Sequence, residues 1–120
     1  MVRAFRGAIT VDSNEKEEIL SATAMLYDEL VAKNSLDAKD FVCMFFSLTP
    51  DLDAVFPARA VRERGVTNVP LMCMAEIPVD GALEKCVRIL LLSNSDKSLE
   101  EINHVYLRDA VKLRPDLVKV

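Results

Sequence analysis

The apolar positions of this chain fall into short runs that are separated by polar segments. Most of the runs are rich in β-branched and aromatic residues, which are typical of strands. Strands are therefore expected over 2–11, 41–49, 69–77, 85–92 and 103–107. Gly7 interrupts the first run and indicates either a bulge or a close approach by another group.

A helical period follows the first run. The residues of one apolar face recur at helical spacing: Ile19, Thr23, Leu26, Tyr27 and Leu30. Residues 12–15 have the pattern of a capping box, which predicts that Asp12 caps this helix and that Glu15 reaches back. The helix is expected to end near Asn34.

Shorter helical segments are expected over 57–64, 99–102 and 109–113. With the strands, they predict a single α+β or α/β domain over residues 1–120, with helices packed on a mixed sheet. The strands are long and apolar for so small a domain, so a face or edge of the sheet needs a cover, and we expect an oligomer. The tail, about 115–120, is expected to be mobile until something docks there.

Composition narrows the class of protein. Hydrophobic residues make up 51% of the 120 residues and charged residues 28%, which is typical of a folded globular domain rather than a disordered chain. The net charge is −4 and no basic block occurs, so we expect no nucleic-acid partner.

Sequence signals for targeting and for disulfides or metal binding also indicate the cellular compartment. No secretory signal pattern occurs at the N-terminus, and the longest apolar run, 41–48, is too short to cross a bilayer. Cys43, Cys73 and Cys86 have no close spacing, which argues against a disulfide framework or a zinc site. A soluble, cytoplasmic protein with no membrane partner is expected.

One arginine, Arg88, lies inside the apolar run 85–92. Arginine keeps its charge in proteins, so a buried guanidinium needs partners or destabilises the fold. Two interpretations are open. Arg88 either forms a structural ion pair with Glu76 or Asp80, or it presents its planar donors to a carboxylate or to an oxygen that gains charge.

Other charged residues leave similar alternatives open. Arg6 in the first strand is either solvated or functional. Arg59 and Arg62 are three apart on a helix, so they form either a solvated basic face or a charged rim beside an anionic ligand. Cys73 and Glu76 are also three apart, and on a strand they can share a site only if the strand ends or bulges between them.

The chain contains a single histidine, His104, and no His-x-x-x-His or Cys-x-x-Cys pattern. Many acid–base mechanisms use histidine, so a metal enzyme or a Ser–His hydrolase is not expected. On the strand predicted for 103–107, His104 and Tyr106 point one way, and Val105 and Leu107 point the other.

Seven stretches resemble, in order, the small mixed α/β class of chorismate mutase. They are RAFRGAITV at 3–11, TPDL at 49–52, AVFPA at 54–58, VPLMCMAE at 69–76, CVR at 86–88, HVYL at 104–107 and LRPDL at 113–117. Each stretch is weak alone, but together they cover nearly the whole chain.

This resemblance implies a homotrimeric pseudo-α/β-barrel with an active site at each subunit interface. It also implies the conversion of chorismate to prephenate, the branch step toward phenylalanine and tyrosine. That reaction is a Claisen rearrangement within one molecule. It needs no nucleophile, metal or cofactor, which is compatible with a chain that has one histidine.

The resemblance further implies the roles of individual residues. Arg88, Glu76 and Arg6 are the expected catalytic residues: Arg88 donates to the breaking ether oxygen, Arg6 and Tyr106 hold the side-chain carboxylate, and Glu76 and the backbone at Cys73 bind the ring hydroxyl. The full set of expected substrate-binding residues is Arg6, Phe56, Ala58, Arg59, Arg62, Leu71, Met72, Cys73, Glu76, Arg88, Tyr106, Leu113 and Arg114. The segment 56–62 is expected to come from the neighbouring subunit.

Two positions depart from the family pattern. Arg59 stands where a lysine is common, which keeps the charge, and Met72 stands where a threonine is common, so only its backbone could make polar contacts. Two rival functions are open: a trimer that binds small carboxylates or processes imines, and a purely structural interaction protein. The combination of Arg6, Glu76, Arg88 and Tyr106 favours the mutase.

Overall fold

The computed structural model describes residues 1–113, and its centre is a sheet of five strands. The strands are β1 Val2–Thr10, β2 Phe41–Leu48, β3 Leu71–Ala75, β4 Cys86–Asn94 and β5 Val105–Leu107. Their order across the sheet is β3-β2-β4-β1-β5. β4 runs antiparallel to both β1 and β2, whereas β2–β3 and β1–β5 are parallel pairs. The sheet is therefore mixed, as the sequence predicted.

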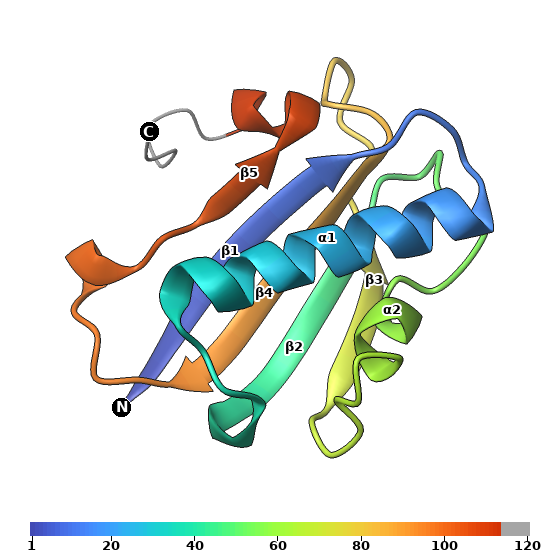
Figure 1. Ribbon diagram of the computed structural model, residues 1–120. Coiled ribbons are helices and arrows are strands. Elements are labelled where there is room, and N and C mark those ends of the chain that lie inside the picture. The colour runs from blue at the N-terminus through green and yellow to red at the C-terminus, as the bar shows by residue number, and fades with distance from the viewer. Residues whose placement is uncertain (114–120) are drawn as a thin grey trace.

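Two α-helices lie on the same face of this sheet: α1, Lys16–Asn34, and α2, Ala58–Arg62 (Figure 1). Three short 3₁₀ turns, Ala38–Asp40, Leu99–Glu101 and Arg108–Lys112, connect or follow the strands. Within residues 1–113, no helix combines the length and the apolar character that crossing a bilayer requires.

The core lies between the sheet and α1. Phe5 and Ile9 of β1 and Val87 and Ile89 of β4 are buried there, because alternate residues of a strand point to the same face. Burial of these side chains against the helix supplies most of the driving force for folding.

Gly7 allows α1 to approach β1 closely. A Cβ atom at this position would lie 2.9 Å from Cδ1 of Leu26 and 3.0 Å from Cδ1 of Leu30. The expected close approach at Gly7 is therefore confirmed, whereas the bulge lies elsewhere, in β2 between Phe41 and Cys43.

The opposite face of the sheet is not covered by α1 or α2 (Figure 1). A corner of it is covered by the last 3₁₀ turn, whose Ala110 packs against Ala8 and Tyr106. Elsewhere apolar side chains such as Met72 and Met74 of β3 are exposed, at 56% and 46%. We call this the open face.

The start of α1 differs from the predicted capping box. Lys16 is the first helical residue, and Glu15, in the capping position, makes no side-chain cap. The carboxylate of Glu18 instead accepts hydrogen bonds from the Asp12 backbone N–H at 2.6 Å and from the Ser13 hydroxyl at 2.6 Å. The Ser13 bond is the largest cause that lowers the pKa of Glu18. The capping box was wrong because Asp12 lies too far outside the helix.

Element ends also differ by a few residues. β4 continues through Ser93 and Asn94, which the sequence placed in a loop, because Ser93 pairs with Arg3 of β1 and its hydroxyl donates to the Asp40 carbonyl at 3.2 Å. β3 is shorter than predicted and ends at Ala75.

Candidate active site

Arg88 lies in the middle of the sheet. It is in register with Ala8 of β1 on one side and with Ser47 of β2 on the other. Because its neighbours Val87 and Ile89 point into the helix-covered core, the Arg88 side chain points to the open face. The alternation of side chains along the strand therefore places the guanidinium on the open face.

Glu76 is the anionic partner of Arg88, at 3.1 Å between Oε2 and Nε. This contact is an ion pair without hydrogen-bond geometry, because Nε is buried and has no hydrogen-bond partner among the described residues. Glu76 reaches this position because β3 ends one residue earlier, and its backbone N–H continues the pairing by donating to Leu48 O at 2.9 Å. Of the two carboxylates that the sequence offered to Arg88, the structure selects Glu76.

Ser47 adds a second contact to the same carboxylate. Its hydroxyl donates to Oε2 of Glu76 at 2.8 Å. Ser47, Glu76 and Arg88 therefore form a polar cluster that joins β2, β4 and the end of β3.

A cavity of about 420 Å³ opens beside this cluster on the open face. Its wall includes Arg6, Ser47, Arg88 and Tyr106, together with apolar residues of β1, β2 and β4. The Tyr106 hydroxyl is buried and has no hydrogen-bond partner among the described residues, like Arg88 Nε. Two buried donors therefore border one cavity. The Tyr106 hydroxyl is available to an anionic or oxygen-rich ligand, whereas Arg88 Nε faces the Glu76 carboxylate in an ion pair.

Arg6 and Tyr106 reach the cavity from β1 and β5, which run parallel to each other. The Arg6 backbone N–H donates to Nδ1 of His104 at 3.0 Å, which ties the start of β5 to β1. As predicted, Val105 and Leu107 point into the helix-side core while Tyr106 points to the open face.

Cys86 lies two residues before Arg88 and is fully buried. Burial raises the pKa of its thiol to about 11, and the charge of Glu76 acts in the same direction while Arg88 opposes it. Cys86 is therefore a neutral thiol at physiological pH and not a nucleophile.

The residues of β3 divide between the two faces. Leu71 and Cys73 pack against the core on the helix side, whereas Met72 and Met74 lie on the open face. The Cys73 side chain thus points away from Arg88, so a contact between this residue and a ligand in the cavity would use its backbone.

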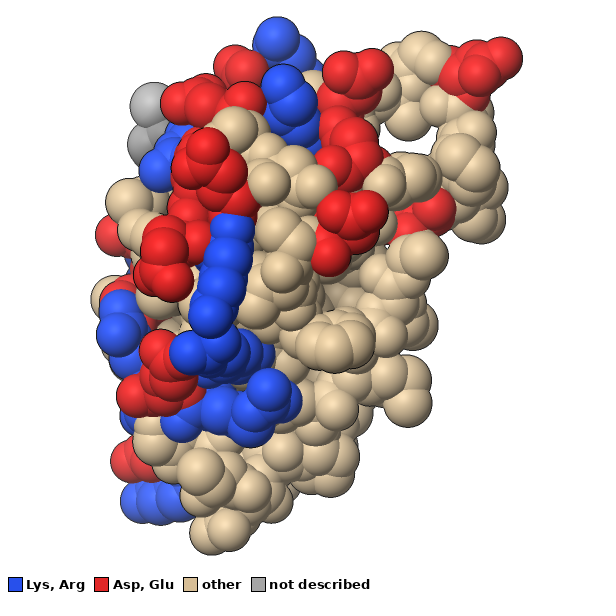
Figure 2. All heavy atoms as spheres, turned by 90° about the vertical axis from the view of Figure 1, so that its right-hand side faces the viewer, with Lys and Arg blue, Asp and Glu red and all other residues tan. Residues whose placement is uncertain are grey.

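Phe56, Arg59 and Arg62 line a different hollow of about 550 Å³, which includes Lys16 and shares no residue with the Arg88 cavity. On the face drawn in Figure 2, lysine and arginine side chains gather beside residues that carry no charge. Phe56 is 71% exposed, while Ala58 is buried at the start of α2. The Arg59 guanidinium pairs with Glu63 at 2.7 Å.

The two remaining predicted positions are at the end of the chain. Leu113 packs against the small cluster that contains Tyr106, at the corner of the open face. Arg114 lies outside the described residues, as does the tail 115–120. Ser47 was missed by the sequence interpretation, although it is the one polar side chain on the open-face side of β2 between Cys43 and Leu48.

Comparison with known proteins agrees with this geometry. The profile of the chorismate mutase type I family matches residues 2–117. The chain belongs to the type I chorismate mutase family. Its function is therefore that of an isomerase, chorismate mutase, and the prediction made from the sequence motifs is confirmed.

Individual relatives are similar over nearly their whole length. The chain is 47% identical to chorismate mutase AroH of Bacillus subtilis (strain 168) over 118 residues, which are 98% of this chain and 93% of the relative. It is 42% identical to chorismate mutase AroH of Thermus thermophilus, with 98% and 97% covered. A chorismate mutase structure from Clostridium thermocellum matches with a TM-score of 0.88 and 47% identity, over 90% of this chain and 96% of that one.

Proposed function

We propose that this chain, as a single domain, converts chorismate to prephenate in the Arg88 cavity, and that the active unit is a homotrimer with one site at each subunit interface. The observation that carries the proposal is the pair of buried donors, Arg88 Nε and Tyr106 Oη, beside one cavity on an uncovered sheet face. No support comes from the structure or the relatives for a carboxylate-binding or imine-processing protein.

Arg88 is the proposed electrostatic catalyst. In the rearrangement the ether C–O bond breaks as a new C–C bond forms, and negative charge gathers on the ether oxygen. A fixed guanidinium donor at that oxygen stabilises the transition state more than the ground state. The ion pair with Glu76, at 3.1 Å, holds the guanidinium in place before the substrate binds.

Arg6 and Tyr106 are the proposed ligands of the side-chain carboxylate. Both border the same cavity as Arg88 and come from adjacent parallel strands. Holding both ends of a flexible dianion favours the compact conformer that reacts, and orientation of this kind supplies up to about 7–11 kcal/mol in favourable cases.

Glu76 and the Cys73 backbone are the proposed partners of the ring hydroxyl. The carboxylate accepts hydrogen bonds, and the extended backbone of β3 offers amide groups beside Met72. Met72 has no side-chain hydroxyl, so its polar contribution is limited to its backbone.

The hollow that contains Phe56, Arg59 and Arg62 is proposed to complete the site of a neighbouring subunit. It shares no lining residue with the Arg88 cavity of its own chain. We therefore propose that the hollow of one chain joins the Arg88 cavity of a second chain. Ala58 and Leu71 are proposed to shape the completed site as apolar residues, and Leu113 is proposed to close it. The resemblance assigns the same closing role to Arg114, which lies outside the described residues.

Mixed trimers test the interface directly. Arg88→Ala and Arg62→Ala chains carrying different tags would be co-expressed, and assemblies that contain both would be isolated by sequential purification on the two tags. In a cyclic trimer, each mixed assembly has one site of three with both arginines, so about one third of the parental turnover is expected. Turnover no greater than that of the separate variants would contradict an interface site.

A further inference from the structure

We infer that Ser47 is a positioning residue for this reaction: its hydroxyl orients the Glu76 carboxylate between Arg88 and the substrate. This inference deepens the proposed function and rests on the roles proposed there for Glu76 and Arg88. Ser47 itself is not assigned a contact with the reacting atoms.

Topology places Ser47 between the two charged residues. β2 lies between β3 and β4 in the sheet, and Ser47 is in register with Met74 on one side and Arg88 on the other. Glu76 follows Met74 by two residues, just beyond the end of β3. Ser47 thus lies on the strand between the end of β3 and Arg88 on β4, and its hydroxyl reaches the Glu76 carboxylate.

The contacts converge on one carboxylate oxygen. Oε2 of Glu76 accepts the Ser47 hydroxyl at 2.8 Å and lies 3.1 Å from Arg88 Nε. Two contacts to the same oxygen fix the rotation of the carboxylate, which leaves Oε1 as the atom to accept a substrate hydroxyl. Hydrogen bonds to a charged group are stronger and more directional than neutral ones.

Glu76 needs such a restraint because of where it lies. Its backbone is held by one hydrogen bond to Leu48 O, and the chain then leaves the sheet through the loop 77–85. A glutamate side chain loses much rotamer freedom when it is fixed, so an unrestrained carboxylate would sample several positions beside Arg88. The Ser47 hydroxyl selects one of them before the substrate arrives.

The test is a double-mutant cycle in kcat/KM for chorismate, with Ser47→Ala, Glu76→Ala and the double variant. Ser47→Ala is expected to lower kcat/KM about tenfold, which corresponds to about 1.4 kcal/mol and is close to the lower end of the range for a hydrogen bond to a charged group. In the Glu76→Ala background the same change is expected to have less than about a twofold effect. Ser47→Thr, which keeps the hydroxyl, is expected to restore parental kcat/KM to within about threefold.

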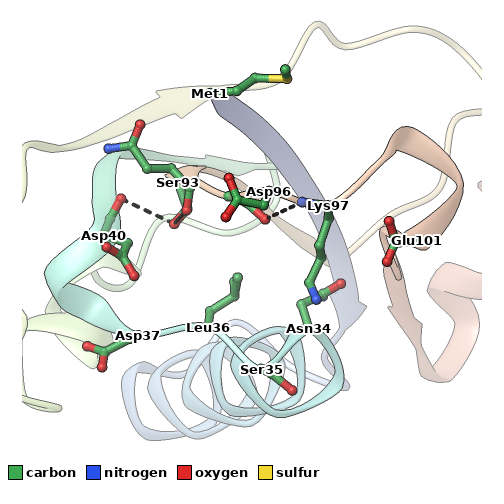
Figure 3. A pocket seen from close by; sticks show the side chains of 12 residues that line it. Met1, Asn34, Ser35, Leu36, Asp37, Asp40, Ser93, Asp96, Lys97 and Glu101 are labelled. Carbon is green, nitrogen blue, oxygen red and sulfur yellow. Dashed lines mark hydrogen bonds between the residues drawn. The ribbon is translucent and has the colours of Figure 1, made fainter.

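Ser93→Ala is the matched control. Ser93 lies at the far end of β4 and lines a separate pocket, where its hydroxyl donates to the Asp40 carbonyl (Figure 3). The substitution removes the same atom from the same sheet, so it is expected to lower thermal stability while kcat/KM stays at the parental value.

The outcomes separate this inference from the proposed function. If Glu76→Ala lowers kcat/KM but Ser47→Ala does not, the inference fails and the proposed roles stand. An equal effect of Ser47→Ala in both backgrounds also overturns it, because Ser47 would not act through Glu76. If Glu76→Ala itself has no effect, the proposed role of Glu76 fails and the inference fails with it.

Discussion

Replacing Glu76 with glutamine isolates the charge in the polar cluster. Glutamine keeps the shape of the side chain and an oxygen that can accept the Ser47 hydroxyl, but it removes the anion that faces Arg88 at 3.1 Å. Arg88 would then be a partly buried cation without a counter-charge, so the free energy of unfolding is expected to fall.

The size of this effect follows from distance and exposure. At 3.1 Å the Coulomb attraction is about 5 kcal/mol for an effective dielectric constant of 20. Removing one partner of a fully buried pair costs about 3–5 kcal/mol, and exposed pairs contribute about 0–1 kcal/mol. The side chains of Arg88 and Glu76 are 35% and 16% exposed, which places this pair between those limits. We expect Glu76→Gln to cost about 2 kcal/mol.

Urea unfolding at a fixed protein concentration measures this cost in two backgrounds. In the parent, Glu76→Gln should reduce the free energy of unfolding, whereas in Arg88→Met it should be neutral or stabilising because no cation remains to pair. A coupling energy of about 2 kcal/mol is expected between the two positions. An equal cost of Glu76→Gln in both backgrounds would refute the ion-pair argument.

Three further predictions concern the residues around the cluster. Arg88→Lys should lower kcat more than about 10²-fold because an ammonium lacks the planar fork, and near-parental turnover would contradict this. Cys73→Ala should leave kcat/KM nearly unchanged, since this side chain faces the core; loss of turnover in a folded protein would assign the thiol a role. The raised pKa of Cys86, about 11 against 9.0 in an ordinary thiol, contributes stability that is complete below pH 9 and is lost between about pH 9 and 11. Over this range the parent should lose roughly 2–3 kcal/mol more unfolding free energy than Cys86→Ala, as measured by urea unfolding; parallel curves would refute it.

The strands could be predicted because their pattern is local. Alternation in 2–11 and 103–107 and the apolar runs in 41–49 and 85–92 were sufficient to place β1, β5, β2 and β4. The capping box was wrong because the spacing between Asp12 and Glu15 matches the motif without stating where the helix begins. The start of α1 depends on how the chain leaves β1. There the Glu18 carboxylate, rather than that of Glu15, accepts hydrogen bonds from the Asp12 N–H and the Ser13 hydroxyl.

Only part of the candidate site could be predicted from the sequence. Arg88 could be recognised as a candidate from the sequence, because a buried guanidinium inside an apolar strand needs an anionic partner. The choice between Glu76 and Asp80 could not be made, since it depends on β3 ending at Ala75. The role of Ser47 could not be predicted from the sequence for a similar reason. It follows from the pairing of β2 with both β3 and β4, and that pairing joins residues far apart in the chain.

The segment 56–62 illustrates a different limit. Sequence placed Arg59 and Arg62 on one helix face, and both line the hollow beside Phe56. Sequence periodicity does not predict that this hollow joins the Arg88 cavity, and within one chain the two share no lining residue. The expectation of a trimer with interface sites came from the resemblance in the sequence, and mixed assemblies test it.

The central claim is that Arg88 carries the catalysis of the chorismate rearrangement, and one assay tests it most directly. Purified protein is added to chorismate, the fall in ultraviolet absorbance is followed, and prephenate is identified as the product. The parent should catalyse this conversion, and Arg88→Ala with an unchanged fold and assembly should lose at least about 10²-fold in kcat. Turnover of the alanine variant within a few-fold of the parent would contradict the role assigned to Arg88.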